Sequence, residues 1–158
     1  MKILITGGTK GIGLAEVKLF DTPENQLFII ARHTESLDNI FKNAVLINAD
    51  LTKPEDIEGA VVKVKSQTDV LDILINNVGV MIMKKFEDMQ NEDINLMLDL
   101  NLRSHMLITK SLLPLLSKSD NPRVIFMSSM AAKSSLVGES VYSAAKSGVT
   151  AFANVLRS

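Results

Sequence analysis

Cysteine and tryptophan are both missing from this chain of 158 residues, and tyrosine occurs only once. Without cysteine, the chain can form neither a disulfide framework nor a thiolate metal site. Its apolar runs fall far short of the roughly 20 residues that a membrane-spanning helix needs. The run Ile3–Ile5 is also too short to be the core of a signal peptide. These absences favour a soluble cytoplasmic protein.

An excess of one charge is missing too, because 17 basic residues face 18 acidic ones and the net charge is -1. No basic run or face of the kind that binds nucleic acid stands out. The apolar share of 46% is an ordinary globular balance, and the length predicts a single domain over residues 1–158.

Several conspicuous side chains have plain structural interpretations. His33 and His105 are far apart and lack metal-ligand spacing, so we expect them to be structural or surface groups and expect no metal site. Four methionines flank the ends of expected strands: Met81, Met83, Met127 and Met130. We expect these methionines to pack in the core, with lining a pocket as the alternative.

Short apolar runs alternate with longer amphipathic stretches along the chain. The short runs predict strands at Ile3–Ile5, Leu27–Ala31, Ala44–Asn48, Ile73–Ile75 and Val124–Met127. Because these runs are apolar at consecutive positions, the strands should be buried on both faces, as in a parallel sheet. Helices are expected over Gly11–Phe20, from Pro54 to about Ser66, from Asn91 to about Ser117, and over Ser140–Leu156. The alternation predicts a doubly wound α/β fold in three layers.

Two local signals refine the expected helices. Thr52 precedes Pro54 and a group of acids, so it is a plausible cap for that helix. Pro114 lies near the end of the long third helix, where it removes a backbone hydrogen bond and is expected to bend the last turns.

Glycine is concentrated in the segment TGGTKGIG, Thr6 to Gly13, which holds four of the eight glycines. Small residues at the end of the first strand let backbone N–H groups and a helix N-terminus approach an anion. In doubly wound sheets, ligands bind at the carboxyl ends of the strands. The spacing Gly-x-x-x-Gly-x-Gly matches neither the best-known dinucleotide fingerprint nor a P-loop. A tight turn without a ligand therefore remains the alternative.

The end of the second strand bears on the choice of cofactor. It reads Ile30-Ala31-Arg32-His33 and lacks the carboxylate that would bind the ribose 2′-hydroxyl of NAD. A guanidinium presents a planar fork that suits a phosphate, and Lys10 adds a second positive charge. Both favour NADP, with NAD less expected. In the alternative interpretation, Arg32 and Lys10 are solvated surface charges.

Further motifs follow in a characteristic order: Asn76-Asn77-Val78-Gly79, Asn101, Ser128-Ser129, and Tyr142 with Lys146. With TGGTKGIG and Asp50-Leu51, this set resembles the short-chain dehydrogenase/reductase family, in the subfamily usually called classical. Val78 stands where alanine is commoner in that family. The resemblance covers essentially the whole chain and implies a Rossmann-type, NAD(P)-binding domain.

The resemblance implies a catalytic set of Asn101, Ser129, Tyr142 and Lys146. It implies cofactor contacts by Gly7, Thr9, Lys10, Gly11, Ile12, Gly13, Arg32, Asp50, Leu51, Asn77, Gly79, Tyr142 and Lys146, with Asp50-Leu51 at the adenine. Lys146 would also contact the nicotinamide ribose, and Asn101 would hold a water for proton supply.

The residue types make chemical sense in these roles. Tyr142 and Lys146 are four apart on an expected helix and so share a face. The ammonium favours the phenolate, which makes Tyr142 a candidate general acid or base for a carbonyl or alcohol oxygen. Ser129 could donate a hydrogen bond to the same oxygen.

Family members usually continue past the point that corresponds to Ser158, so we expect this chain to lack the last strands and the substrate-covering region. Val124–Met127 would then be an apolar sheet edge, which predicts self-association, with a homodimer as the leading possibility. Candidate residues for the shared face are Leu107, Leu112, Leu115, Leu116, Val149, Phe152 and Val155. Alternatively, these residues cover the sheet of their own subunit.

These interpretations predict an NADP(H)-dependent oxidoreductase that interconverts a small-molecule carbonyl and an alcohol. The first alternative is a truncated cofactor-binding or dimerising remnant with little or no turnover. The second is an epimerase or dehydratase on the same scaffold. The sequence does not identify the substrate.

Overall fold

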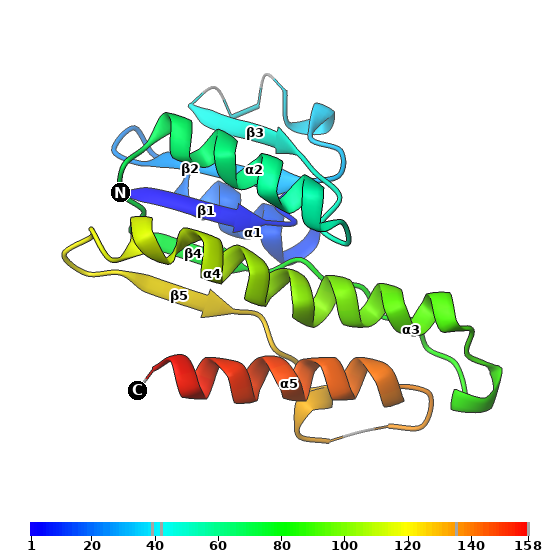
Figure 1. The fold of residues 1–158 in the computed structure, drawn as a ribbon. Coiled ribbons are helices and arrows are strands. Elements are labelled where there is room, and N and C mark those ends of the chain that lie inside the picture. Colours follow the sequence, from blue (N-terminus) through cyan, green and yellow to red (C-terminus); the bar gives the residue numbers. More distant parts are fainter. Residues whose placement is uncertain (39, 42, 135, 158) are drawn as a thin grey trace.

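A computed structural model of the chain describes residues 1–38, 40–41, 43–134 and 136–157. Five parallel strands form one sheet in the order β3-β2-β1-β4-β5 (Figure 1). The strands are β1 (Lys2–Thr6), β2 (Gln26–Ala31), β3 (Ala44–Asn48), β4 (Ile73–Asn76) and β5 (Arg123–Phe126). The strand order reverses beside β1, so the predicted doubly wound α/β fold is confirmed.

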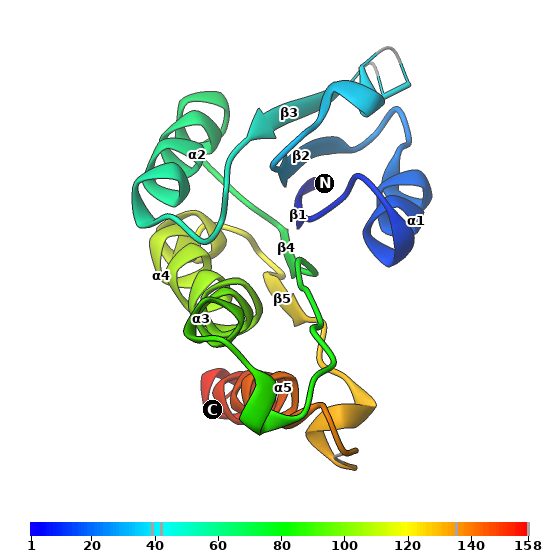
Figure 2. The same cartoon turned by 90° about the vertical axis from the view of Figure 1, so that its right-hand side faces the viewer.

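Helices cover both faces of this sheet. They are α1 (Gly11–Phe20), α2 (Pro54–Gln67), α3 (Asn91–Leu98), α4 (Ser104–Leu116) and α5 (Ser140–Leu156). Figure 2 shows α1 on one side of the sheet and α2, α3 and α4 on the other, with α5 beyond β5. Three short helical turns join them: η1 (Glu35–Leu37), η2 (Phe86–Asp88) and η4 (Met130–Ala132).

The side chains of β1 show why the sheet is buried on both faces. Leu4 belongs to the apolar cluster that includes Ile57 of α2 and Ile108 of α4. Its neighbours Ile3 and Ile5 belong to a second cluster, which includes Val17 of α1. Because successive side chains of a strand point to opposite faces, a continuous apolar run supplies both cores.

The stretch expected as one long helix contains a wider turn. The π-helical segment η3 (Asp99–Arg103) joins α3 to α4, and Asn101 within it is completely buried. π-helical turns inside α-helices often occur at functional sites. Pro114 lies in the last turn of α4, close to the helix end as predicted.

The predicted cap at Thr52 is wrong. The residue before α2 is Lys53, and no side chain caps the helix. Thr52 lies one position too early, and its N–H and hydroxyl donate instead to Asp50 Oδ1, at 3.1 and 2.8 Å. A residue of the helix itself ties the start of α2 to the preceding loop, because Asp56 Oδ2 accepts the N–H of Asp50 at 2.9 Å.

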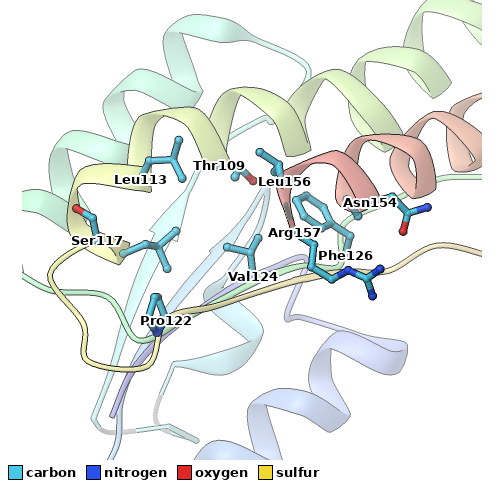
Figure 3. A pocket seen from close by; sticks show the side chains of 11 residues that line it. Thr109, Leu113, Ser117, Pro122, Val124, Phe126, Asn154, Leu156 and Arg157 are labelled. Carbon is cyan, nitrogen blue, oxygen red and sulfur yellow. The ribbon is translucent and has the colours of Figure 1, made fainter.

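Strand β5 lies at the sheet edge, as predicted, and Ile125 on it is 39% exposed. Beside it, a groove of about 630 Å³ opens between β5, α4 and the last turns of α5 (Figure 3). Leu113, Val124, Phe126 and Leu156 supply apolar walls, and Arg157 lies among the lining residues.

The residues proposed for a shared dimer face divide into two groups. Leu112, Leu115, Leu116 and Val149 are buried within their own chain, so for them the prediction is wrong. They lie on the sides of α4 and α5 that face the rest of the subunit, which is the alternative interpretation. Leu107 and Phe152 are partly buried, and Val155 is 73% exposed.

Among the helices of the described ranges, none combines the length and the apolar character that crossing a bilayer requires.

The orientation of α4 can be tested with two neighbouring leucines. Leu112→Ala should lower the free energy of unfolding by about 2–5 kcal/mol, because it leaves a cavity in the core below α4. Leu113→Ala, at a position that is 45% exposed, should cost less than about 1 kcal/mol. Urea denaturation of the two variants checks this, and a larger loss for Leu113→Ala would contradict the described packing.

Candidate functional site

A cleft of about 530 Å³ opens where the carboxyl ends of the central strands converge. Its walls come from the loops after β1, β2, β3 and β4, together with Leu100 of η3. Ten of the residues predicted to contact a cofactor line it: Gly7, Thr9, Lys10, Gly11, Ile12, Gly13, Arg32, Leu51, Asn77 and Gly79. The structure thus gathers lining residues that lie as far apart in the sequence as Gly7 and Leu100.

The glycine segment places the start of α1 against the cleft. Lys10 precedes the helix in an extended conformation, and no side chain caps the helix. The first N–H groups of α1 therefore lack side-chain acceptors, and the positive end of the helix dipole adds to their attraction for an anion. A Cβ on Gly13 would lie 2.4 Å from Gly7 O and 2.5 Å from Asn77 Nδ2. Only glycine allows this approach.

The charge of the lining is one-sided. Among the described residues that line the cleft none is acidic, whereas Lys10 and Arg32 are cationic and exposed. His33 also lines the cleft and is exposed, which agrees with its expected surface position. Lys10 and Arg32 form a cationic rim on the cleft, and such a rim attracts a phosphate more strongly than a neutral ribose hydroxyl.

The adenine contacts implied for Asp50 and Leu51 divide in the structure. Leu51 lines the cleft, while Asp50 lies next to it with its carboxylate bound to Thr52. Partial burial raises the pKa of Asp50. The hydrogen bonds from Thr52 and the charges of Arg32 and Lys53 outweigh this effect, so the pKa ends below its usual value.

The loop after β4 is tied directly to the glycine segment. Thr6 Oγ1 accepts the N–H groups of Asn77 and Val78, at 3.1 and 3.2 Å. Asn77 Nδ2 in turn donates to the carbonyls of Thr6 and Gly7, at 3.0 and 3.3 Å. Thr6 was not among the expected site residues, although its position at the end of β1, directly before the glycines, was a usable signal.

A second group of candidate residues surrounds the buried Lys146. Its Nζ donates to Met127 O at 2.7 Å and lies 5.9 Å from the ring centroid of Tyr142, which confirms that the two residues share a face of α5. A Cβ built on Gly79 would lie 3.5 Å from the same Nζ, so the ammonium borders the wall of the cleft. Desolvation lowers the pKa of Lys146 from 10.5 to about 8.

The turn that carries Ser129 is held against α5. Ser128 Oγ donates to Lys146 O at 3.2 Å, and Ser147 Oγ donates to Ala132 O at 3.3 Å. Ser129 Oγ accepts the N–H of Ala131 at 3.2 Å and so caps η4. Its hydroxyl hydrogen has no acceptor among the described residues and can donate to a ligand.

Asn101 and His105 hold the loop after β4 from the side of the long helix. Asn101 Oδ1 accepts the N–H of Val80 at 2.7 Å, and its Nδ2 donates to Val80 O at 2.8 Å. His105, one turn later, is completely buried with Nε2 at 2.9 Å from Val78 O. Burial lowers the pKa of His105 to about 4. The hydrogen bond to Val78 O opposes this shift, and the charge of Lys146 adds a smaller lowering. The imidazole is therefore neutral at pH 7 and donates from Nε2.

The expectation that the methionines pack in the core is wrong for three of them. Met81, Met83 and Met130 are 48%, 59% and 74% exposed. Met81 and Met83 lie on the loop after β4, and Met130 begins the short turn η4 beyond β5. In the sequence, Met81 and Met83 follow closely after Val80, which lines the cleft, and Met130 directly follows Ser129.

Comparison with known proteins identifies the family. The family model described as "short chain dehydrogenase" matches residues 1–158. The chain belongs to the short-chain dehydrogenase family. A short-chain dehydrogenase from Streptomyces avermitilis superposes with a TM-score of 0.91 at 26% identity, over 98% of this chain and 58% of the other.

Two curated relatives show the same family character. Oxidoreductase UcpA of Salmonella typhimurium is 28% identical over 92% of this chain. The NADP-dependent 3-hydroxy acid dehydrogenase of Schizosaccharomyces pombe is 27% identical over 98% of it. The alignments span 58% and 64% of the length of these two relatives, so the chain covers less than two thirds of either.

The burial of Lys146 can be tested by the pH dependence of stability. Between about pH 8 and 10.5 the unfolded chain keeps the lysine proton that the folded chain has released, so the wild type gains stability as the pH rises. Lys146→Met lacks this gain. The stability of Lys146→Met relative to the wild type should therefore fall by about 3 kcal/mol between pH 7 and pH 10.5.

Urea denaturation across this pH range provides the measurement, with Lys110→Met on the exposed side of α4 as the control. The control should keep the wild-type pH profile. A Lys146→Met profile parallel to that of the wild type would contradict the depressed pKa.

Proposed function

We propose that this chain is an NADP(H)-dependent oxidoreductase that interconverts a carbonyl and an alcohol on a small molecule. One observation carries the proposal: the desolvated Lys146 ammonium borders the cleft at Gly79 and lies beside Tyr142. The glycine segment and the uncapped start of α1 lie in the lining of the same cleft. A dinucleotide spanning the cleft would reach from the cationic rim to the tyrosine.

The residues present fit NADP. The uncapped N-terminus of α1 suits the pyrophosphate, and Arg32 with Lys10 suits the 2′-phosphate. Leu51, with Asp50 beside it, would contact the adenine, and Asn77 and Gly79 would line the path to the nicotinamide. Lys146 and Tyr142 would lie at the nicotinamide ribose. Bound NADP(H) supplies hydride transfer at nicotinamide C4, which no side chain can perform.

The protein's own groups would manage the proton and the developing charge. Tyr142 would give its hydroxyl proton to the carbonyl oxygen, or take one from the alcohol. Ser129 would donate a hydrogen bond to the same oxygen and stabilise negative charge there. Lys146, held by Met127 O, would stabilise the phenolate.

Asn101 would support proton supply through a water, as the family resemblance implies. In the structure its side-chain amide binds both backbone groups of Val80, so it also holds the cleft wall beside Lys146. The choice of NADP over NAD agrees with the name of the Schizosaccharomyces pombe relative, which is NADP-dependent.

The rival function is a cofactor-binding or dimerising chain with little turnover. The exposed Met81, Met83 and Met130 favour it, because an open mouth admits water to the site and weakens its electrostatics. An epimerase or dehydratase remains the other alternative, and no contact in the described residues favours it. Self-association through the β5 edge, where Ile125 is exposed, and a cytoplasmic location stay predictions from the sequence.

Arg32 should decide the cofactor preference. Arg32→Gln should weaken NADPH binding about tenfold or more, because the 2′-phosphate loses a charged partner, and should change NADH binding less than about threefold. Fluorescence titration with both dinucleotides measures this. Arg123→Gln, at the start of β5 and outside the cleft lining, is the matched control and should bind like the wild type. A wild type that prefers NADH would refute the NADP assignment.

Tyr142→Phe separates chemistry from binding. The variant should lose at least about 100-fold in kcat for NADPH oxidation with a panel of small ketones and aldehydes, since the proton donor is gone. NADPH affinity should stay within about threefold of the wild type. Turnover preserved in Tyr142→Phe would exclude the proposed mechanism, and wild-type binding without turnover on every carbonyl compound would favour the remnant.

A further inference from the structure

The long helix and the segment that continues β4 are joined by a ladder of polar contacts. Asn101 binds Val80, His105 binds the carbonyl of Val78, and Thr109 Oγ1 accepts from Asn76 Nδ2 at 3.1 Å. Four residues of helix rise about 6 Å and two residues of extended chain about 6.6 Å, so the two spacings match. Residues 101, 105 and 109 therefore meet residues 80, 78 and 76 in order.

The contact between His105 and Val78 O differs from the other two because it sets the orientation of a peptide group in the cleft wall. Val78 O and the N–H of Gly79 belong to one planar trans peptide, so they point in opposite directions. His105 is buried and outside the cleft lining, whereas Val78 and Gly79 both line the cleft. With Val78 O turned inward to the imidazole, the N–H of Gly79 is turned outward. Among the described residues it has no acceptor.

The neighbouring hydrogen bonds do not fix the orientation of the peptide group between Val78 and Gly79. Thr6 Oγ1 holds the N–H of Val78 on one side and Asn101 holds Val80 on the other, but neither touches the peptide between Val78 and Gly79. A Cβ on Gly79 would lie 2.8 Å from Asn101 Oδ1 and would displace the amide that holds Val80, so glycine suits this position. Glycine also lowers the barrier to turning the peptide over. Among the described residues, only the imidazole is placed to prevent this rotation.

We propose that His105 is a positioning residue that presents the N–H of Gly79 to an oxygen acceptor of the dinucleotide at the nicotinamide end of the cleft. The proposal rests on the proposed function, because it takes the dinucleotide as the ligand. His105 does not touch the ligand and acts through the Val78 carbonyl. Asn76 and Thr109, at the far contact of the ladder, lie outside the cleft lining and serve only stability.

Three variants test the proposal by NADPH fluorescence titration and urea denaturation. His105→Leu leaves Val78 O without its donor and should weaken NADPH binding about tenfold. His105→Gln carries a donor at a position similar to Nε2 and should restore binding to within about threefold of the wild type. Thr109→Val also breaks one buried contact of the ladder, so it should lose comparable stability while keeping NADPH affinity within about threefold.

Equal weakening by Thr109→Val and His105→Leu would reduce His105 to a structural residue and overturn the proposal. Wild-type affinity in His105→Leu, or no rescue in folded His105→Gln, would also overturn it.

A measurement without cofactor keeps this test separate from the proposed function. In the ligand-free wild type, the His105 imidazole should give the nitrogen signals of the neutral Nε2–H form at pH 7, distinct from those of exposed His33. Amide exchange at Gly79 should change several-fold in His105→Leu and stay near wild type in His105→Gln. If the wild type binds neither dinucleotide, the proposed function fails, and an Nδ1–H imidazole or unchanged exchange in His105→Leu would separately refute the orienting contact.

Discussion

The segment from Asn76 to Val80 is the part on which the rest of the candidate site depends. It leaves β4 in the middle of the sheet, and every side of it is held: Thr6 from β1, Asn101 and His105 from the long helix. These hydrogen bonds are needed because the backbone groups just after a buried strand have neither a neighbouring strand nor water to pair with. Side chains replace those partners. The replacement fixes where the glycine segment, the helix and Lys146 stand relative to one another.

Lys146 illustrates the cost of building such a site. Removing an ammonium from water is unfavourable, and a single carbonyl, Met127 O, accepts its hydrogen bond among the described residues. Apolar packing elsewhere in the fold, such as the cluster around Leu4 and Ile108, offsets this unfavourable free energy. A buried cation next to a phenol has little structural use, which is why this pair supports a chemical role. The neutral His105 beside it fits the same environment, since a second charge there would be costly.

The cleft and the edge groove of Figure 3 are two different consequences of one topology. In a parallel sheet whose order reverses at β1, the loops at the carboxyl ends separate and leave room for a ligand. At the edge of the sheet, β5 pairs only with β4 among the described residues, and apolar side chains of α4 and α5 border an open groove. The first hollow is lined by glycine and positive charge. The second is lined mainly by apolar side chains, among them leucine, valine and phenylalanine.

Much of this protein could be predicted from local sequence patterns. Consecutive apolar residues such as Ile3–Ile5 mark strands buried on both sides, and the glycines of TGGTKGIG mark a turn in which backbone segments approach one another closely. The four-residue spacing of Tyr142 and Lys146 determined that they share a helix face. These features depend on periodicity and on residue shape, which are properties of the chain itself.

Other features were decided only by the tertiary structure. Leu112 and Leu113 are equally apolar, yet one is buried and the other is 45% exposed, because the direction of α4 over the sheet sets which face packs. Thr52 was a good cap by type, but the helix started one residue too late for it. His105 gave no sign of its role, since its partner Val78 lies 27 residues away in the sequence. Contacts between distant segments depend on how elements pack, and no local pattern encodes that packing by itself.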